Sequence, residues 1–274
     1  MTQHARRSAR GRSGELSYLD RPGPGTPVLF LHPVNTAAEV WTDVAAALGG
    51  ARRALAVDYR AHGRSEPGGP YLPADYAADA LSVLDAAGVG RAHLVCGSIG
   101  GAVAMELAAA APDRVASIAA FGAALRVSWG PDLLDEAEAG LRELGVRAWF
   151  ARHGGEILGP KSRADAAGRL VELASGGRDG DRGLDTVVRV LRSTFGEADS
   201  RPAAAVVAAA PPPGRVFVGS HDPTCPPARA RELAAGLHTE VRVLDGIGHL
   251  PMLEDPAGTA AAAREFHAAV EEGR

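Results

Sequence analysis

The 274-residue sequence predicts an α/β fold with a mostly parallel central sheet flanked by helices and an inserted helical segment. Short apolar segments alternate along the chain with segments of helical pattern. This alternation is typical of parallel sheets whose strands are buried on both faces and joined by crossover helices. It stops near Ala124 and resumes after Pro213, which indicates the insertion. The chain length suits one large domain with such an insertion.

The first half of the predicted sheet contains four strands and three connecting helices. The strands are expected, as continuous apolar segments, at residues 28–32, 53–58, 92–96 and 115–121. The helices are expected at residues 38–48, 74–87 and 99–110. Because each helix separates two strands, the strands are expected to run parallel.

The alternation returns near the end of the chain, with strands expected at residues 215–219 and 241–244 and helices at 202–210, 227–236 and 256–271. The middle contains helical patterns at residues 133–144, 163–174 and 184–195, with a mobile loop expected at Gly176, Gly177 and Gly180. We therefore divide the chain into four parts. They are a disordered basic tail (1–13), a first core segment (14–123), a helical cap (124–200) and a second core segment (201–274).

Composition excludes several classes of function. The net charge of −4, from 29 basic and 33 acidic residues, gives no basic surface for nucleic acid. The two cysteines, Cys96 and Cys225, suggest neither a disulfide framework nor a metal site, and no cofactor is expected. No apolar segment approaches the ~20 residues that span a membrane, and the N-terminal arginines lack the apolar segment of a signal peptide. We expect a cytoplasmic protein with a small-molecule substrate; the sequence leaves homo-oligomer formation open.

Ser98 is the first candidate for chemistry. It follows the apolar strand at 92–96 and directly precedes the helix at 99–110, with small residues around it. A serine on such a sharp strand-to-helix turn is lifted out of the sheet, at a backbone cost of roughly 1–3 kcal/mol. The following helix N-terminus directs unpaired N–H groups toward negative charge near Ser98. The pattern predicts a nucleophile, although Cys96 replaces the first glycine of the usual Gly-x-Ser-x-Gly motif.

A serine nucleophile needs a base, and the base needs a carboxylate that orients it. Asp222 follows the strand expected at 215–219, and His249 follows the strand at 241–244. Ligands in open α/β sheets bind outside the carboxyl ends of the strands. The sequence therefore predicts that Ser98, Asp222 and His249 meet there as a catalytic triad, in a known chain order.

Several segments resemble the α/β-hydrolase fold superfamily, specifically its cap-bearing serine hydrolases of the esterase and enol-lactonase type. These segments are Asp58-Tyr59-Arg60-Ala61-His62-Gly63-Arg64-Ser65, Gly219 to Pro226, and Gly246-Ile247-Gly248-His249-Leu250 with the residues up to Pro256. The resemblance covers residues 15–272 and implies the same fold and triad. Epoxide hydrolases and dehalogenases of this fold are excluded, because they need a carboxylate where Ser98 stands.

The resemblance also implies an oxyanion hole, in which backbone N–H groups bind the negative oxygen formed during acyl transfer. By position, its donors are Val34 and Ile99. The family usually has His-Gly where this chain has His32-Pro33. Proline has no N–H, but Val34 follows it and keeps its own. Asn35 either turns its amide toward the pocket or serves as a turn residue, and His62 is expected to brace its loop.

The predicted cap concentrates aromatic residues in a chain with only 5% aromatic content. We consider Trp129, Trp149 and Phe150 candidate substrate contacts; packing within the cap is the alternative. The cap arginines are expected on a solvated face rather than at an anionic substrate: Arg126, Arg142, Arg147 and Arg152. Three functions remain open on these residues: ester or lactone hydrolysis through an acyl-enzyme, hydrolysis of a carbon–carbon bond beside a carbonyl, and ligand binding without turnover.

Overall fold

An eight-stranded sheet forms the centre of the computed structural model, which describes residues 4–273. The strands are β1 (Ala5–Gly11), β2 (Gly14–Arg21), β3 (Val28–Leu31), β4 (Ala54–Val57), β5 (Ala92–Gly97), β6 (Val115–Phe121), β9 (Gly214–Gly219) and β10 (Val241–Leu244). Their order is β1-β2-β4-β3-β5-β6-β9-β10. The six strands from β4 to β10 are parallel, and β1 and β2 form an antiparallel hairpin at one edge. The predicted α/β class with a mostly parallel sheet is confirmed.

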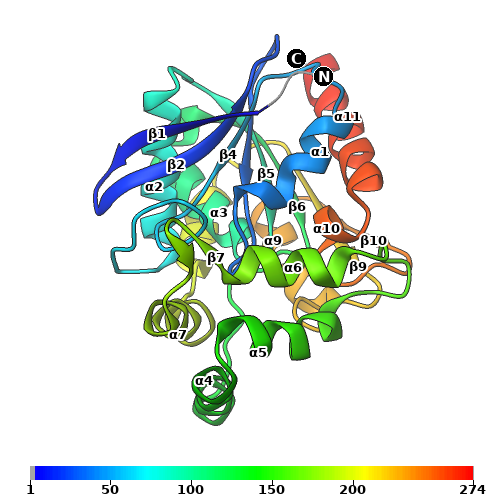
Figure 1. Cartoon of the computed structure of the whole chain (residues 1–274). Coiled ribbons are helices and arrows are strands. Elements are labelled where there is room, and N and C mark those ends of the chain that lie inside the picture. Colours follow the sequence, from blue (N-terminus) through cyan, green and yellow to red (C-terminus); the bar gives the residue numbers. More distant parts are fainter. Residues whose placement is uncertain (1–3, 274) are drawn as a thin grey trace.

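Helices cover both faces of the sheet (Figure 1). One face carries α2 (Pro73–Ala86), α3 (Gly100–Ala110), α8 (Arg201–Val207) and α9 (Pro227–Gly236). The other carries α1 (Thr42–Ala47), α10 (Pro251–Glu254) and α11 (Pro256–Glu272), with the short helix η1 (Ala38–Trp41). A further short helix, η2 (Pro112–Arg114), precedes β6. Along β5, Leu94 and Cys96 pack into the first face and Val95 into the second, so the strand is apolar throughout because both of its faces are buried.

The predicted insertion between β6 and α8 is helical and lies at one end of the sheet (Figure 1). Its elements are α4 (Pro131–Leu144), α5 (Val146–His153), η3 (Gly154–Ile157), α6 (Ala166–Ser175), α7 (Leu184–Arg192) and η4 (Ser193–Glu197). They bury an apolar cluster of their own, which includes Leu141 and Val187. Sequence patterning missed α5, because only Gly145 separates this short helix from α4. Residues 176–181, predicted as a loop without a strand, form the antiparallel pair β7 (Gly176–Gly177) and β8 (Gly180–Asp181).

The prediction of a disordered tail over residues 1–13 is wrong for residues 5–11, which form β1; residues 1–3 lie outside the described part. The strand pairs along its whole length with β2, from Ala5 opposite Asp20 to Gly11 opposite Gly14. Arg6 forms ion pairs with Asp58 at 2.8 Å and with Glu39. The arginine-rich composition suggested a solvated tail, but Arg6, Arg7 and Arg10 belong to an edge strand in which Ala9 and Gly11 are buried.

Among residues 4–273, no helix combines the length and the apolar character that crossing a membrane requires.

Candidate active site

Ser98 occupies the sharp turn between β5 and α3. Its backbone has φ = +52°, in the left-handed region that serine rarely adopts, at a cost of roughly 1–3 kcal/mol. The turn is held by a hydrogen bond from the Ser98 N–H to the Phe121 carbonyl at 3.2 Å. Gly100 is required here, because a Cβ at that position would lie 2.6 Å from the Leu31 carbonyl oxygen. The sequence thus builds a strained, tightly enclosed serine.

Cys96 fits the turn although the usual motif has glycine there. Its side chain is fully buried between the sheet and the α3 layer, and its thiol contacts the Ala119 carbonyl at 3.5 Å. Burial raises the pKa of the Cys96 thiol far above its ordinary value, so the sulfur stays protonated. Cys96 is therefore a packing residue of the core with no nucleophilic character.

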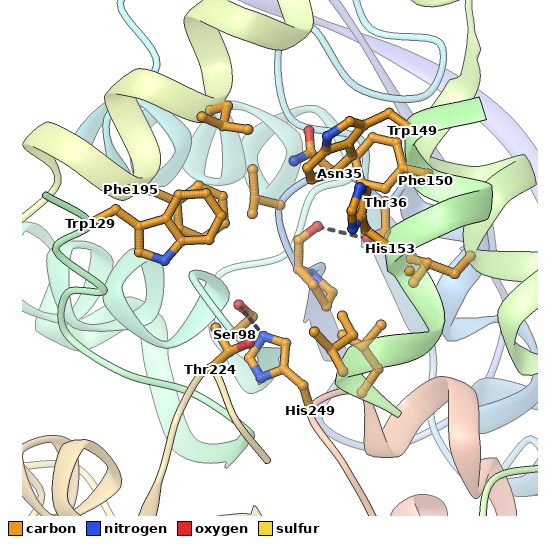
Figure 2. A pocket seen from close by; sticks show the side chains of 17 residues that line it. Asn35, Thr36, Ser98, Trp129, Trp149, Phe150, His153, Phe195, Thr224 and His249 are labelled. Atoms are coloured by element: carbon orange, nitrogen blue, oxygen red, sulfur yellow. Dashed lines mark hydrogen bonds between the residues drawn. The ribbon is translucent and has the colours of Figure 1, made fainter. Parts of the chain in front are cut away.

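The three residues predicted to meet at the strand ends do so. His249 Nε2 lies 2.9 Å from Ser98 Oγ, and His249 Nδ1 lies 3.0 Å from each carboxylate oxygen of Asp222 (Figure 2 shows the contact between Ser98 and His249). All three side chains are buried. The backbone N–H groups of Thr224 and Cys225 donate to Asp222 Oδ1 at 2.9 and 2.7 Å, which fixes the carboxylate. This arrangement can transfer a proton from Ser98 to an imidazole whose orientation is set.

Glu254 organises the loop that carries His249, and sequence reasoning gave it no role. Its carboxylate is buried and accepts four hydrogen bonds. The donors are the N–H groups of Gly159 (2.8 Å), Gly248 (2.7 Å) and Leu250 (2.8 Å) and the hydroxyl of Ser162 (2.7 Å). Gly248 and Leu250 flank His249 in sequence, so Glu254 fixes the backbone on both sides of the imidazole. A glutamate five residues after a candidate histidine was the available signal.

Two further contacts position the same loop. The His249 N–H donates to the Ile157 carbonyl at 2.8 Å, which joins the loop to η3 of the cap. Gly122, with φ = +53°, follows β6 and passes directly behind the triad. A Cβ on Gly122 would lie 2.4 Å from the His249 carbonyl oxygen and 3.2 Å from Asp222 Oδ2. Only glycine allows this close approach.

The two predicted oxyanion-hole donors, Val34 and Ile99, have free N–H groups. None of residues 4–273 accepts a hydrogen bond from either one. Val34 lines the cavity beside Ser98, and Ile99 lies at the N-terminus of α3. An N–H that stays unpaired in a buried turn costs free energy unless a ligand or water meets it. Their function as an oxyanion hole stays a prediction.

Two buried histidines brace the loop that contains Val34. His32 Nδ1–H donates to the Pro33 carbonyl at 2.7 Å, and the Tyr59 N–H donates to His32 Nε2 at 3.1 Å. The Asn35 N–H donates to His62 Nε2 at 3.3 Å. Burial lowers the pKa of His32 to about 3 and that of His62 well below its ordinary value, so both rings are neutral hydrogen-bonding braces. This agrees with the role expected for His62.

A cavity of about 110 Å³ opens above Ser98. Figure 2 shows Trp129 and Phe195 on one side of it and Trp149 and Phe150 on another. Most of its remaining lining is small or apolar, and the further residues are Pro33, Val34, Asn35, Thr36, Ser98, His153, Gly154, Ile157, Leu170, Leu191, Thr224, His249 and Leu250. The cavity is therefore apolar with a few polar groups, as ligand sites commonly are.

All four predicted contact residues, Asn35, Trp129, Trp149 and Phe150, line this cavity. The aromatic residues also pack in the cap: Trp129 stacks on Phe195 with ring centroids 4.4 Å apart, and Phe150 belongs to the cap cluster. These aromatic side chains therefore both line the cavity and pack within the cap, and their contact with substrate stays a prediction. Among residues 4–273, no group of three or more His, Cys, Asp or Glu side chains is placed to hold a metal ion.

Known proteins resemble this chain in sequence and in structure. A sequence model described as "Alpha/beta hydrolase family" matches residues 28–262. RutD of Azorhizobium caulinodans, named as a candidate carbamate hydrolase, is 39% identical over 111 residues, which are 40% of this chain and 42% of that protein. Lipase LipV of Mycobacterium tuberculosis is 32% identical over 173 residues, 58% of this chain and 64% of that protein. Each match therefore spans less than two thirds of the relative.

Among solved structures, the enol-lactonase from Burkholderia xenovorans LB400 superimposes with a TM-score of 0.78 and 24% identity. The superposition covers 96% of this chain and 100% of the enol-lactonase. At this level of identity the likeness concerns the fold alone.

Proposed function

The chain belongs to the alpha/beta hydrolase family, and from this premise we propose that it is a serine hydrolase that cleaves a carboxylic ester or lactone of a small organic molecule. The observation that carries the proposal is the hydrogen-bonded chain from Ser98 through His249 to Asp222 beneath an apolar cavity. Carbonyl chemistry of this kind is performed by the same three groups on several unrelated folds.

The hydrogen-bonded triad supports a two-step acyl-transfer mechanism. Ser98 Oγ attacks the substrate carbonyl carbon while His249 Nε2 takes the serine proton. The Asp222 carboxylate accepts the Nδ1–H hydrogen bond and stabilises the imidazolium. The N–H groups of Val34 and Ile99 bind the oxyanion, and each such donor is worth roughly 2.7–4 kcal/mol of the barrier. The carbon–oxygen bond breaks, and His249 protonates the leaving alcohol. Water, activated by His249, then hydrolyses the acyl-enzyme and restores Ser98.

Cavity size and lining support a small, largely apolar acyl or alcohol group. A cavity of about 110 Å³ beside Ser98 suits a small acyl or alcohol group, and its aromatic walls favour apolar groups. The names of the relatives, a lipase and a candidate carbamate hydrolase, are compatible with attack on a carboxyl-type carbonyl.

Labelling with a fluorophosphonate tests the nucleophile. The reagent phosphonylates activated serines, and mass spectrometry locates the adduct. We expect labelling of Ser98 in the wild-type protein, none in Ser98→Ala, and at least a hundredfold slower labelling in His249→Ala, the order of magnitude that removing a general base costs. No labelling of Ser98 in the folded protein would contradict the proposal and favour ligand binding without turnover.

A substrate panel then separates the chemistries open to this triad. Short esters, lactones and β-diketones are offered to the wild-type protein and to Ser98→Ala. Hydrolysis of esters or lactones that is lost in Ser98→Ala is the expected result. Turnover of the diketones alone would instead identify cleavage of a carbon–carbon bond beside a carbonyl.

A further inference from the structure

Arg182 is a buried cation at the boundary between cap and core. It follows β8, and only 7% of its surface is exposed. Its Nη1 donates to Asn35 Oδ1 at 3.1 Å and to the Ala174 carbonyl at 3.2 Å, while Nε and Nη2 have no hydrogen-bond partner in the described part of the chain. None of the carboxylates within residues 4–273 lies at ion-pair distance from it. A buried charge without a counter-ion is costly, so its presence calls for an explanation.

The contact with Arg182 fixes the orientation of the Asn35 side chain. A guanidinium only donates hydrogen bonds, so the Asn35 atom that faces it must be the carbonyl oxygen. The Asn35 N–H is already used by His62, and the residue has φ = +55° in the left-handed region. The side-chain NH₂ group is what remains, and no described residue accepts from it. Asn35 lines the cavity, and Figure 2 shows it across the open space from Ser98 and His249.

The electrostatic surroundings of this end of the cavity are positive. The lining contains no aspartate, glutamate, lysine or arginine. Burial lowers the pKa of Arg182 to about 10, which still leaves it charged at neutral pH. Burial keeps three groups that face it neutral at that pH: the rings of His32 and His62 and the hydroxyl of Tyr76. Its charge therefore has no paired counter-ion among residues 4–273, in a region where low polarisability makes charge interactions strong.

We propose that Asn35 and Arg182 form an anion-selective end of the substrate cavity, which favours esters or lactones that carry a carboxylate distal to the scissile bond. The Asn35 NH₂ group donates to that carboxylate. Arg182 is a positioning residue: it orients the amide and supplies the positive potential. This inference rests on the proposed function, because it names the substrate class of the same site.

The test compares two substrates of equal shape. One is the mono-para-nitrophenyl ester of adipate, and the other is its analogue with an isopropyl group in place of the free carboxylate. A second pair carries the carboxylate or the isopropyl group on the alcohol side. For one of the two pairs, we expect the wild-type protein to prefer the anionic member by about 10- to 100-fold in kcat/KM, the range that one well-placed charge interaction provides. No preference in either pair would overturn the inference.

Matched variants isolate the charge of Arg182. Arg182→Gln keeps a hydrogen-bond donor for Asn35 but removes the charge. We expect the ratio of kcat/KM for the anionic substrate to that for the neutral one to fall toward one. Arg182→Lys keeps the charge and should retain most of it. Asn35→Asp places a carboxylate beside Arg182 and should invert the preference; this variant decides the matter if Arg182→Gln fails to fold. If the ratio of kcat/KM for the anionic substrate to that for the neutral one is equal in Arg182→Gln and Arg182→Lys, the proposed role of charge is contradicted. A change in packing alone would affect both substrates alike.

Failure of this inference differs visibly from failure of the proposed function. If Ser98 is labelled and the neutral ester is hydrolysed without any charge preference, only the anion-selective end is refuted. If Ser98 is not labelled and no ester is hydrolysed, the hydrolase proposal itself fails.

Discussion

The substitution Glu254→Gln removes a charge that never touches substrate, yet we expect it to impair both stability and turnover. In the wild-type protein Oε2 accepts from Gly159, Ser162 and Gly248, and Oε1 accepts from Leu250. Glutamine has one acceptor oxygen. Its best orientation keeps the three bonds at the Oε2 position and turns its NH₂ group toward the Leu250 N–H. Two donors then face each other in a buried site.

The magnitude follows from counting these bonds. Hydrogen bonds to a charged acceptor contribute about 1.5–3 kcal/mol each, and a buried unsatisfied donor costs about 1–3 kcal/mol. One bond is lost and the remaining three are weakened by the loss of charge, so we expect the free energy of unfolding to fall by roughly 2–4 kcal/mol. Because Gly248 and Leu250 flank His249, the imidazole shifts as well, and a displacement near 1 Å costs roughly a hundredfold in kcat.

Denaturant unfolding measures the first effect, and ester hydrolysis under saturating substrate measures the second. The matched control is Asp255→Asn, which alters the neighbouring carboxylate. That side chain caps α11 through the Gly258 N–H at 2.9 Å and has no hydrogen bond to the His249 loop. The control should lose less than about 1 kcal/mol of stability and no activity, because asparagine caps a helix nearly as well as aspartate and only the favourable charge at the helix N-terminus is lost. A Glu254→Gln protein with wild-type kcat and a loss of stability below that of the control would refute the reasoning.

Three further predictions concern groups around the site and the core. Gly122→Ala should reduce kcat by at least tenfold while the protein stays folded, because its Cβ would press on the His249 carbonyl; unchanged kinetics would contradict this close approach. Cys96→Ala should keep fluorophosphonate labelling of Ser98 and lose about 1–2 kcal/mol of stability, because the core loses the buried sulfur. Loss of labelling would contradict the description of Cys96 as a packing residue only. Burial lowers the pKa of His267 to about 3, so the folded protein keeps this ring neutral while the unfolded chain protonates it below about pH 6.5. The free energy of unfolding of the wild-type protein should therefore fall as the pH falls from about 6.5 toward 3. In denaturant titrations, His267→Phe should make this fall shallower by up to about 1.4 kcal/mol per pH unit. Equal slopes in the two proteins would contradict a neutral His267 in the folded state.

The sheet and the meeting of Ser98, Asp222 and His249 were predictable, because both depend on local signals. A buried strand is a continuous apolar segment, and a polar residue directly after it must lie at the carboxyl edge of the sheet. No contact between distant segments has to be known. Asn35 was a candidate because it lies in the loop that the resemblance identified with the oxyanion hole, with a turn residue as the alternative; the structure places it in the cavity lining.

What sequence reasoning missed depends on contacts between segments far apart in the chain. The strand β1 is defined by its pairing with β2 and by the ion pair from Arg6 to Asp58, neither of which composition reveals. Glu254 acquires its role from Gly159, 95 positions away. Arg182 was not singled out among the cap arginines, because its burial beside Asn35 depends on how the cap packs against the core. Arg142 and Arg147, by contrast, form exposed ion pairs on the cap, as expected.

The hydrogen bond from the His249 N–H to the Ile157 carbonyl has a consequence for how the cap can move. The backbone of the proposed general base is held by the cap, and Glu254 ties Gly159 of the same cap segment to the loop. If the cap swings open from η3, it withdraws a support of the imidazole at the same moment that it admits solvent. Water admitted through such an opening meets Ser98 while the base is out of alignment, so hydrolysis of the acyl-enzyme requires the cap to be seated. A molecule that holds η3 away from the core would thus inhibit turnover by displacing the imidazole.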